Sequence, residues 1–349
     1  MNLVNEVVIH KVFGKGRVSS LEDNYMVVSF HGDEKKFLYP DSFDEFFEAQ
    51  NPKLNDEIQA QLAVIKEKEI KEYEEKKQRD EEQRELSTPR GRRRSAKARK
   101  IQRANVAFKC NYCDGGKTSS DVGFNGVCSD DTMVHNIEVK KRAWCSSAQC
   151  PCFKYLKGEL KREQLEKMNS EGNFVCYESQ MFKNWKAFAG VVQSGKRKNE
   201  PMRLQKVQKN SLCVLTTRDI ESTEKDRYIF GVFLVDESYE GDKNTEGYVG
   251  TNSKYKLKLS LPEARKMLFW NYHFNDNRPE VAMWSSGLHR YLDDNEAVQI
   301  LSDIVKLKKG TSEEKLSIEF LDYYCEVNNI QLGDVPEKNG AIMRTKNLD

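Results

Sequence analysis

The first 50 residues contain short apolar runs, each bounded by glycine, proline or acidic residues. These runs are expected to form strands at residues 7–9, 26–30 and 36–39. Gly14 and Gly16 indicate a tight turn after the first run, and Pro40 ends the last one. Three to five short strands in about 45 residues are expected to close into an SH3-like or Tudor-like β-barrel.

Residues 54–86 contain neither glycine nor proline and consist mainly of Glu, Lys, Gln and Arg. Their apolar residues trace only a thin stripe, formed by Ile58, Leu62, Ile65 and Tyr73. A dimeric coiled coil needs a continuous apolar seam, whereas a helix that is polar on nearly all sides is solvated. We therefore predict a long spacer helix, which at 1.5 Å per residue would span roughly 50 Å.

The second half of the chain alternates strand-like and helix-like patterns. Apolar runs predict strands at 211–216, 228–235 and 254–259, and helical periodicity predicts helices at 262–270 and 295–306. The fold class expected from the whole pattern is α+β and multidomain. The predicted domains are a barrel at 1–50, a charged spacer helix at 51–89, a basic arm at 90–109, a Cys-rich module at 106–180, an α+β recognition domain at 181–332 and a flexible tail at 333–349.

Charge is distributed in blocks that the net value conceals. The 349 residues include 57 Lys and Arg against 55 Asp and Glu, a formal charge of +2. Residues 1–50 contain five basic and nine acidic residues, hence −4, whereas residues 90–109 contain nine basic and no acidic residues. A basic run of this purity favours phosphate contacts, because neutralising phosphates releases counterions. The predicted nucleic-acid contacts are Arg90, Arg92, Arg93, Arg94, Lys97, Arg99, Lys100 and Arg103.

Seven of the nine cysteines lie between residues 106 and 180. Cys110 and Cys113 form a C-x2-C pair followed by two glycines, and a second group follows about thirty residues later, before a helix-like segment at 153–165. This arrangement is typical of a treble-clef-like zinc site. The preferred ligands are Cys110, Cys113, Cys145 and Cys150, with Cys152 next. His135 and Cys128 are further candidates, although Cys128 and Cys176 are better explained as small buried residues. A cubane iron–sulfur cluster is the alternative.

Aromatic residues are frequent in the predicted recognition domain, and most of them are expected in its core. Two clusters also contain amide, hydroxyl and basic groups, a mixture suited to stacking an unpaired base and reading its edge. A packed core with satisfied polar tips explains the clusters equally well. The candidates for a base pocket are Trp185, Trp270, Tyr272, Trp284, His289 and Arg290.

Catalysis receives less support from the sequence. His135 lies between the two cysteine groups, as the catalytic histidine does in zinc-braced HNH nucleases. Val134 precedes it where those nucleases usually have an acidic residue, and the next histidine is His273. The chain contains no P-loop, GxGxxG, HExxH or GxSxG motif. A metal-dependent nuclease, which would use His135 or carboxylates in 219–242, is therefore the alternative function.

The sequence contains no run of about 18 apolar residues, so no membrane-spanning segment is expected. Its first residues lack a basic region followed by an apolar one, and the cysteines are clustered and odd in number. These features predict a cytoplasmic protein whose thiols bind metal rather than forming disulfides.

Two resemblances add to this interpretation. Residues 10–18, HKVFGKGRV, followed by V-V-S-F at 27–30, resemble the C-terminal Tudor-like module of UvrD/PcrA-type helicases. That module is an adaptor, so the resemblance implies docking to a protein such as RNA polymerase or to nucleic acid. The chain has no helicase motif, so only the adaptor role is implied.

The remainder resembles an uncharacterised bacterial family often labelled malate synthase, through R-A-W-C at 142–145, L-T-T-R at 215–218 and G-L-H-R-Y at 287–291. No malate synthase active-site pattern accompanies these motifs. The strand-rich part at 211–259 is faintly similar to PUA-like domains (EVE, ASCH and YTH), which read modified bases.

Together these observations predict a nucleic-acid-binding protein, most consistent with DNA that is modified or damaged. A metal site, zinc by preference, would stabilise the Cys-rich module, and the N-terminal barrel would recruit a protein partner. A protein-interaction scaffold, in which the metal only stabilises the fold, is the third alternative.

Overall fold

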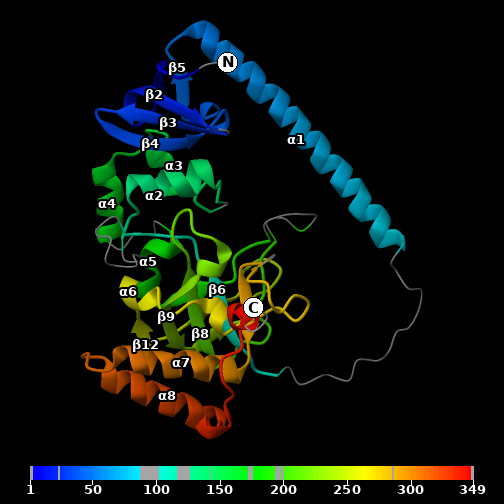
Figure 1. The fold of residues 1–349 in the computed structure, drawn as a ribbon, viewed down its shortest axis with the longest axis vertical. Coiled ribbons are helices and arrows are strands. Elements are labelled where there is room, and N and C mark those ends of the chain that lie inside the picture. The colour runs from blue at the N-terminus through cyan, green and yellow to red at the C-terminus, as the bar shows by residue number, and fades with distance from the viewer. Residues whose placement is uncertain are drawn as a thin grey trace. The chain divides into compact units, whose positions relative to one another are not determined.

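The computed structural model describes residues 3–22, 24–86, 102–115, 126–142, 144–171, 176–192, 197, 200–284 and 287–346. These residues form an α+β structure (Figure 1). The chain divides into two compact units, each assembled from two segments. Unit 1 contains residues 1–100 and 130–175, and unit 2 contains residues 101–129 and 176–349. The segment predicted as one Cys-rich module at 106–180 is therefore divided between the units.

Unit 1 begins with an antiparallel five-stranded sheet in the order β4-β3-β2-β1-β5. Its strands are β1 (Val7–His10), β2 (Gly14–Glu22), β3 (Tyr25–Phe30), β4 (Asp33–Leu38) and β5 (Phe47–Ala49). The predicted strands are confirmed, but Gly14 and Gly16 belong to β2 and pair with β1 rather than forming a turn by themselves.

The N-terminal sheet is not a closed barrel. No pairing joins β4 to β5 among the described residues. The 3₁₀-helix η1 (Asp41–Phe43) occupies the connection between these strands, and β5 has only three residues. The predicted closed barrel was wrong, because the number of strands alone does not ensure that the last strand, β5, pairs with β4.

Helix α1 (Pro52–Leu86) confirms the predicted long helix. Its first turns bury Leu54, Ile58 and Leu62, and the sequence that follows is mostly charged. Tyr39 Oη donates a 2.9 Å hydrogen bond to Gln61. The start of α1 is therefore part of the packed N-terminal structure.

Unit 1 continues with α2 (Asp130–Val134), the π-helix η2 (His135–Val139), α3 (Pro151–Leu156) and α4 (Arg162–Ser170). The single helix predicted at 153–165 is two helices. Gly158 adopts a φ of 76° between them, a conformation that glycine tolerates and a helix does not. Phe153 of α3 packs edge-on against Phe46, with ring centroids 5.9 Å apart.

Unit 2 contains a mixed five-stranded sheet in the order β12-β9-β8-β6-β13. Its strands are β6 (Asn105–Lys109), β8 (Leu212–Thr217), β9 (Tyr228–Leu234), β12 (Lys256–Lys258) and β13 (His289–Leu292). Every residue of β8 and β9 is buried, which explains their continuous apolar sequence. Strand β6, parallel to β8, includes the end of the predicted basic arm.

A smaller antiparallel sheet in unit 2 has the order β10-β11-β7. It consists of β10 (Glu237–Tyr239), β11 (Tyr248–Gly250) and β7 (Lys186–Phe188). The helices of unit 2 are α5 (Tyr177–Asn184), α6 (Leu261–Ala264), α7 (Asp294–Lys308), α8 (Glu314–Asn328) and α9 (Ala341–Lys346), with the 3₁₀-helices η3 (Glu224–Asp226), η4 (Phe269–Asn271) and η5 (Leu332–Asp334). Helices α7 and α8 run side by side (Figure 1).

The C-terminal segment was predicted to be a flexible tail, but residues up to 346 are placed and 341–346 form α9. Gly340 lies against η4, where a Cβ atom would be only 2.4 Å from the carbonyl oxygen of Trp270. Its N–H donates a 3.0 Å hydrogen bond to Asn271 O. A polar sequence therefore folds here through backbone contacts that composition does not reveal. Within the described residues, no helix is long and apolar enough to cross a bilayer.

Candidate functional site

Three buried cysteines lie in the first segment of unit 2. Cys110 directly follows β6, and the Sγ atoms of Cys113 and Cys128 are 3.2 Å apart. The carboxylate of Asp114 accepts hydrogen bonds from the N–H (2.8 Å) and Oγ (2.5 Å) of Ser129. This clasp holds the two cysteine-bearing loops together, so Cys128 is a stronger ligand candidate than its sequence context indicated.

Cys110 lies deeper, with its Sγ 3.8 Å from Met181 Sδ. Burial, reinforced by the nearby Glu178 carboxylate, raises the pKa of the Cys110 thiol. A neutral thiol is a poor ligand, but a bound cation stabilises the thiolate directly. Cys110 therefore fits a metal site only if binding of the metal displaces the proton from its thiol.

The second cysteine group belongs to unit 1. Cys150 immediately precedes α3, Cys152 is buried within that helix, and Cys145 is half-buried. The preferred ligand set therefore has two members in unit 2 and two in unit 1. No group of three or more His, Cys, Asp or Glu side chains in the described ranges is arranged to hold a metal. All nine cysteines lie in those ranges, and none is in a disulfide.

Three candidates for the base pocket are core residues. Trp270, Tyr272 and Trp284 are at most 2% exposed, and the two indoles meet edge-on with centroids 6.3 Å apart. Tyr272 Oη donates a 2.8 Å hydrogen bond to Asp303. No face of these rings is open to a stacking base, which matches the alternative of a packed core.

Trp284 is in contact with two guanidinium groups. Those of Arg227 and Arg290 lie 5.0 and 5.5 Å from its ring centroid. Arg227 is 2% exposed and forms an ion pair with Glu224, so it is held inside the unit. The sequence did not indicate Arg227 as a site candidate, because a single arginine directly before a strand gives no sign of its burial. His289 is half-buried, and burial, with Arg290 nearby, lowers its pKa to about 4.

Trp185 differs from the other tryptophans of unit 2, because it is half-buried rather than enclosed. It follows the last residue of α5 and has a φ of 45°. Lys256 Nζ lies 5.9 Å from the centroid of its ring. Among the tryptophan candidates it is the one that is half-buried and has a lysine beside its ring.

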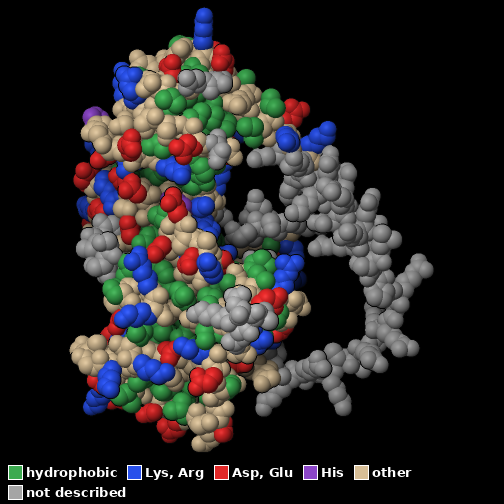
Figure 2. Space-filling view, in the orientation of Figure 1, with side chains coloured by type: hydrophobic (Ala, Val, Ile, Leu, Met, Phe, Trp, Pro, Cys, Tyr) green, Lys and Arg blue, Asp and Glu red, His purple; other side chains and the backbone are tan. Residues whose placement is uncertain are grey.

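Most of the predicted nucleic-acid contacts, from Arg90 to Lys100, lie outside the described residues. Arg103 is described, and it serves the fold: its guanidinium contacts Asp294 and donates a 3.1 Å hydrogen bond to Asn105. These bonds engage both terminal nitrogens of the guanidinium within the fold. Figure 2 shows Lys and Arg side chains interspersed with Asp and Glu over the visible face, without a large area of one sign.

The candidates for catalysis are not gathered into a metal site. His135 is half-buried at the start of η2. The carboxylates between 219 and 242 serve local structure. Asp219 accepts from Tyr228 Oη (2.8 Å), and Asp236 accepts from the N–H groups of Asn252 and Ser253 (2.9 Å each).

A buried polar pair in unit 1 was not predicted. His10 Nε2 lies 3.2 Å from Glu138 Oε1, and both side chains are fully buried. Burial, followed by the charges of Lys11 and Lys35, lowers the pKa of His10 to about 3. Burial also raises the pKa of Glu138 well above its usual range. The signal in the sequence was Glu138 between the apolar residues Ile137 and Val139, which by itself does not identify a partner.

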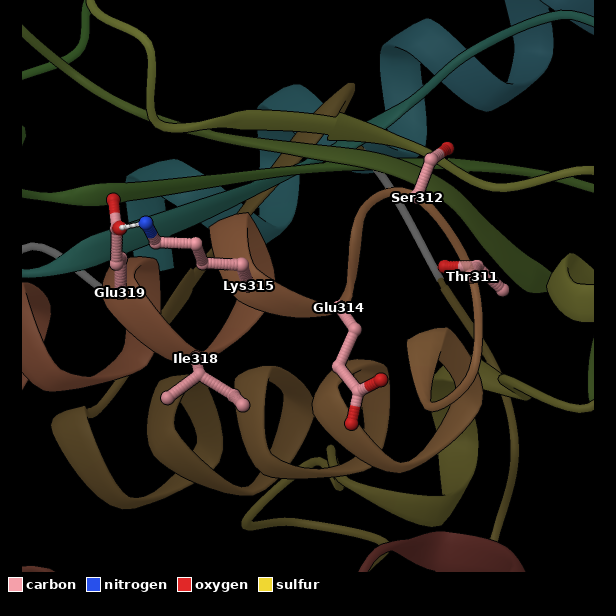
Figure 3. A pocket seen from close by; sticks show the side chains of 6 residues that line it. All are labelled: Thr311, Ser312, Glu314, Lys315, Ile318 and Glu319. Atoms are coloured by element: carbon pink, nitrogen blue, oxygen red, sulfur yellow. Dashed lines mark ion pairs between the residues drawn. The ribbon is translucent and has the colours of Figure 1, made fainter.

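One open surface groove lies at the start of α8 (Figure 3). Glu314 and Ile318 point out of the helix into it, and Lys315 pairs with Glu319 at 3.9 Å. Apart from Ile318, the residues that line it are polar or charged: Thr311, Ser312, Glu314, Lys315 and Glu319. Comparison of the chain with protein-family models, curated proteins and solved structures gave no match.

Proposed function

We propose that this chain binds nucleic acid. The observation that carries the proposal is the run of nine basic residues without a carboxylate between 90 and 109. The structure removes Arg103 from the set of contacts and assigns Lys109 to β6, so the proposed contact is residues 90–100, with seven cations. Phosphate neutralisation by such a segment provides affinity without sequence preference.

A metal bound by thiolates is proposed as a stabilising element. The pair Cys113 and Cys128 supports it, because two sulfurs 3.2 Å apart beside a hydrogen-bonded clasp resemble half of a tetrahedral ligand set. Zinc is favoured, with an iron–sulfur cluster as the alternative. The metal would hold the loops around β6 and would take no part in a reaction.

The N-terminal sheet is proposed to bind a protein rather than nucleic acid. Its residues carry a charge of −4, which repels phosphate, and the Tudor-like resemblance implies an adaptor. RNA polymerase is the partner that the resemblance suggests. Unit 2 is proposed to supply the recognition surface, with modified or damaged DNA as the ligand.

Fluorescence anisotropy with labelled single-stranded DNA, duplex DNA and RNA, at several KCl concentrations, tests the proposal. Changing Arg92, Arg93 and Arg94 together to Gln should weaken binding and flatten its salt dependence, by a slope of up to roughly 2.7 on duplex DNA. The charge-matched control changes Lys68, Lys71 and Lys76 of α1 to Gln. Equal affinity and slope in both variants would contradict the proposal. Mg²⁺-dependent cleavage would show a nuclease instead.

A further inference from the structure

Trp185 occupies a backbone conformation that a tryptophan adopts at a cost. Its N–H donates to Met181 O (2.8 Å), so it terminates α5, and its carbonyl accepts from Thr251 N–H (3.1 Å). With a φ of 45°, it is in the left-handed position that usually carries glycine at the end of a helix. An L-residue there costs about 1–2 kcal/mol. Strain of this kind at a bulky residue points to a role beyond packing.

Aromatic side chains pack against the ring of Trp185, which is half-buried. Phe182 and Phe233 lie 5.1 and 6.0 Å from it, centroid to centroid, and the Phe233 ring meets it edge-on. Phe182 is itself fixed against the sheet, because its ring covers Gly231 of β9. Trp185 therefore presents part of a rigid indole on packed aromatic residues.

Two lysines lie over the rings of Trp185 and Phe182, and a third, Lys186, is directed to Tyr248 and Glu237. Lys256 and Lys258 alternate along the edge strand β12, so they share one face of it, with Nζ atoms 5.9 Å from the Trp185 ring and 5.2 Å from the Phe182 ring. Lys186, next to Trp185, has its Nζ 3.5 Å from the Tyr248 ring centroid and 3.7 Å from Glu237. Lys256 forms no ion pair with the described residues. We call Phe182, Trp185, Lys186, Lys256 and Lys258 the Trp185 strip.

We propose that the Trp185 strip binds single-stranded nucleic acid, with an unpaired base stacked on Trp185 and the adjacent phosphates against Lys256 and Lys258. Aromatic rings flanked by cations are the common design of single-strand binding, because every base has a π-face and every linkage a negative charge. A duplex cannot offer its base faces, so the strip discriminates by strandedness. The inference rests on the proposed function and names its ligand class and its site.

The test uses the full chain with fluorescein-labelled oligothymidine, oligouridine and a matched DNA duplex. Trp185→Ala should lose roughly 5- to 150-fold in single-strand affinity, the range for one stacked base, and change duplex binding by less than twofold. Trp185→Phe should keep most of the affinity but lose the quenching of tryptophan fluorescence that binding causes. Lys256→Gln should reduce the single-strand salt slope by roughly 0.7. Lys225→Gln, an exposed lysine on η3, is the control and should match the wild type.

The outcomes separate this inference from the proposed function. Wild-type protein that binds no nucleic acid overturns both. Protein that binds nucleic acid, but whose Trp185→Ala variant binds single strands like the wild type, overturns only the Trp185 strip. If Trp185→Ala does not fold, the Trp185→Phe and Lys256→Gln variants decide: unchanged quenching together with an unchanged salt slope rejects the site. Equal affinities for oligothymidine and oligouridine would show that the base face, not the sugar, is recognised. If heparin displaces the oligonucleotide equally from the wild type and from Trp185→Phe, and binding quenches no tryptophan fluorescence, the strip is only a polyanion contact.

Discussion

His10 is surrounded by five phenylalanine rings, yet it keeps two polar contacts. Its Nδ1 accepts the N–H of Val12 at 3.0 Å, so this nitrogen is unprotonated, and Nε2 faces Glu138. The ring centroids of Phe13 and Phe47 lie 4.6 and 4.8 Å away. A second proton on His10 would break the bond to Val12 and place a charge inside an aromatic box. Its neutral form is therefore part of the folded state.

His10 contributes to the stability of unit 1 in a way that depends on pH, and Glu138, whose raised pKa favours low pH, acts in the opposite direction. The folded pKa of His10, about 3, lies below its unfolded value of 6.5, so its contribution is complete above pH 6.5 and is lost as pH falls. The loss is about 1.4 kcal/mol per pH unit. His10→Gln should be less stable than the wild type at pH 7, and the difference should shrink by this amount per unit below pH 6. Urea unfolding between pH 5 and 8 measures it. Parallel curves for the two proteins would contradict the assignment.

The neighbouring thiols of Cys113 and Cys128 lead to a second prediction about single residues. Metal binding is coupled to folding, so Cys113→Ser and Cys128→Ser should each reduce the bound metal and destabilise unit 2. Cys325→Ser, on α8, should retain full metal content. Metal analysis of anaerobically purified protein measures the content. Absorption near 400 nm, roughly the range of iron–sulfur clusters, would show that the metal is such a cluster and not zinc. Full metal in Cys128→Ser would return Cys128 to the role of a small buried residue.

At the scale of elements, β6 is the strand on which unit 2 depends. It pairs with β8 on one side and β13 on the other, although its sequence looked like the end of a basic arm. Its Asn105 is fully buried and joins three elements. The side-chain oxygen accepts from Leu212 N–H (2.7 Å) and Tyr324 Oη (2.9 Å), and the amide donates to Asp293 O (2.9 Å).

Asn105→Ala should therefore destabilise unit 2 by about 2–4 kcal/mol, because it leaves the buried N–H of Leu212 without its acceptor and removes one of the two acceptors of the Tyr324 hydroxyl. Guanidinium unfolding followed by circular dichroism measures the change. Asn244→Ala, at an exposed turn position, should change stability by about 0.5 kcal/mol or less. A similarly small effect at Asn105 would show that the network is dispensable.

At the scale of the whole molecule, the N-terminal sheet is not an independent module. It belongs to the same compact unit as residues 130–175. Lys35 pairs with Asp131 at 2.5 Å and Lys141 with Asp41 at 2.7 Å, in addition to the buried contact of His10 with Glu138. Although α1 separates the sheet from residues 130–175 along the sequence, the sheet still belongs to the same compact unit as those residues.

Deletion of residues 1–50 should therefore destabilise residues 130–175, rather than only abolish a docking function. Hydrogen exchange should show loss of amide protection over α2, η2 and α3 in the truncated chain, because Phe46 and His10 no longer cover them. Protection of α7 and α8 in unit 2 should be unchanged and serves as the internal control. Retained protection over 130–175, with loss only of a co-purifying protein, would support the independent adaptor predicted from the sequence.

Local patterns in the sequence determined the elements whose formation depends on their own residues. Helix α1 follows from a stretch without glycine or proline that is rich in helix-forming residues, and β8 and β9 follow from short apolar runs rich in β-branched and aromatic residues. The composition of residues 90–109 likewise determined the candidate for phosphate contact.

Tertiary structure alone decided which side chains meet. It paired His10 with Glu138 across 128 positions, enclosed Trp270 and Trp284 but left Trp185 accessible, and divided the cysteines between two units. These outcomes depend on contacts between segments that are far apart in the sequence, whereas residue spacing reports on local conformation and on which face of an element is buried.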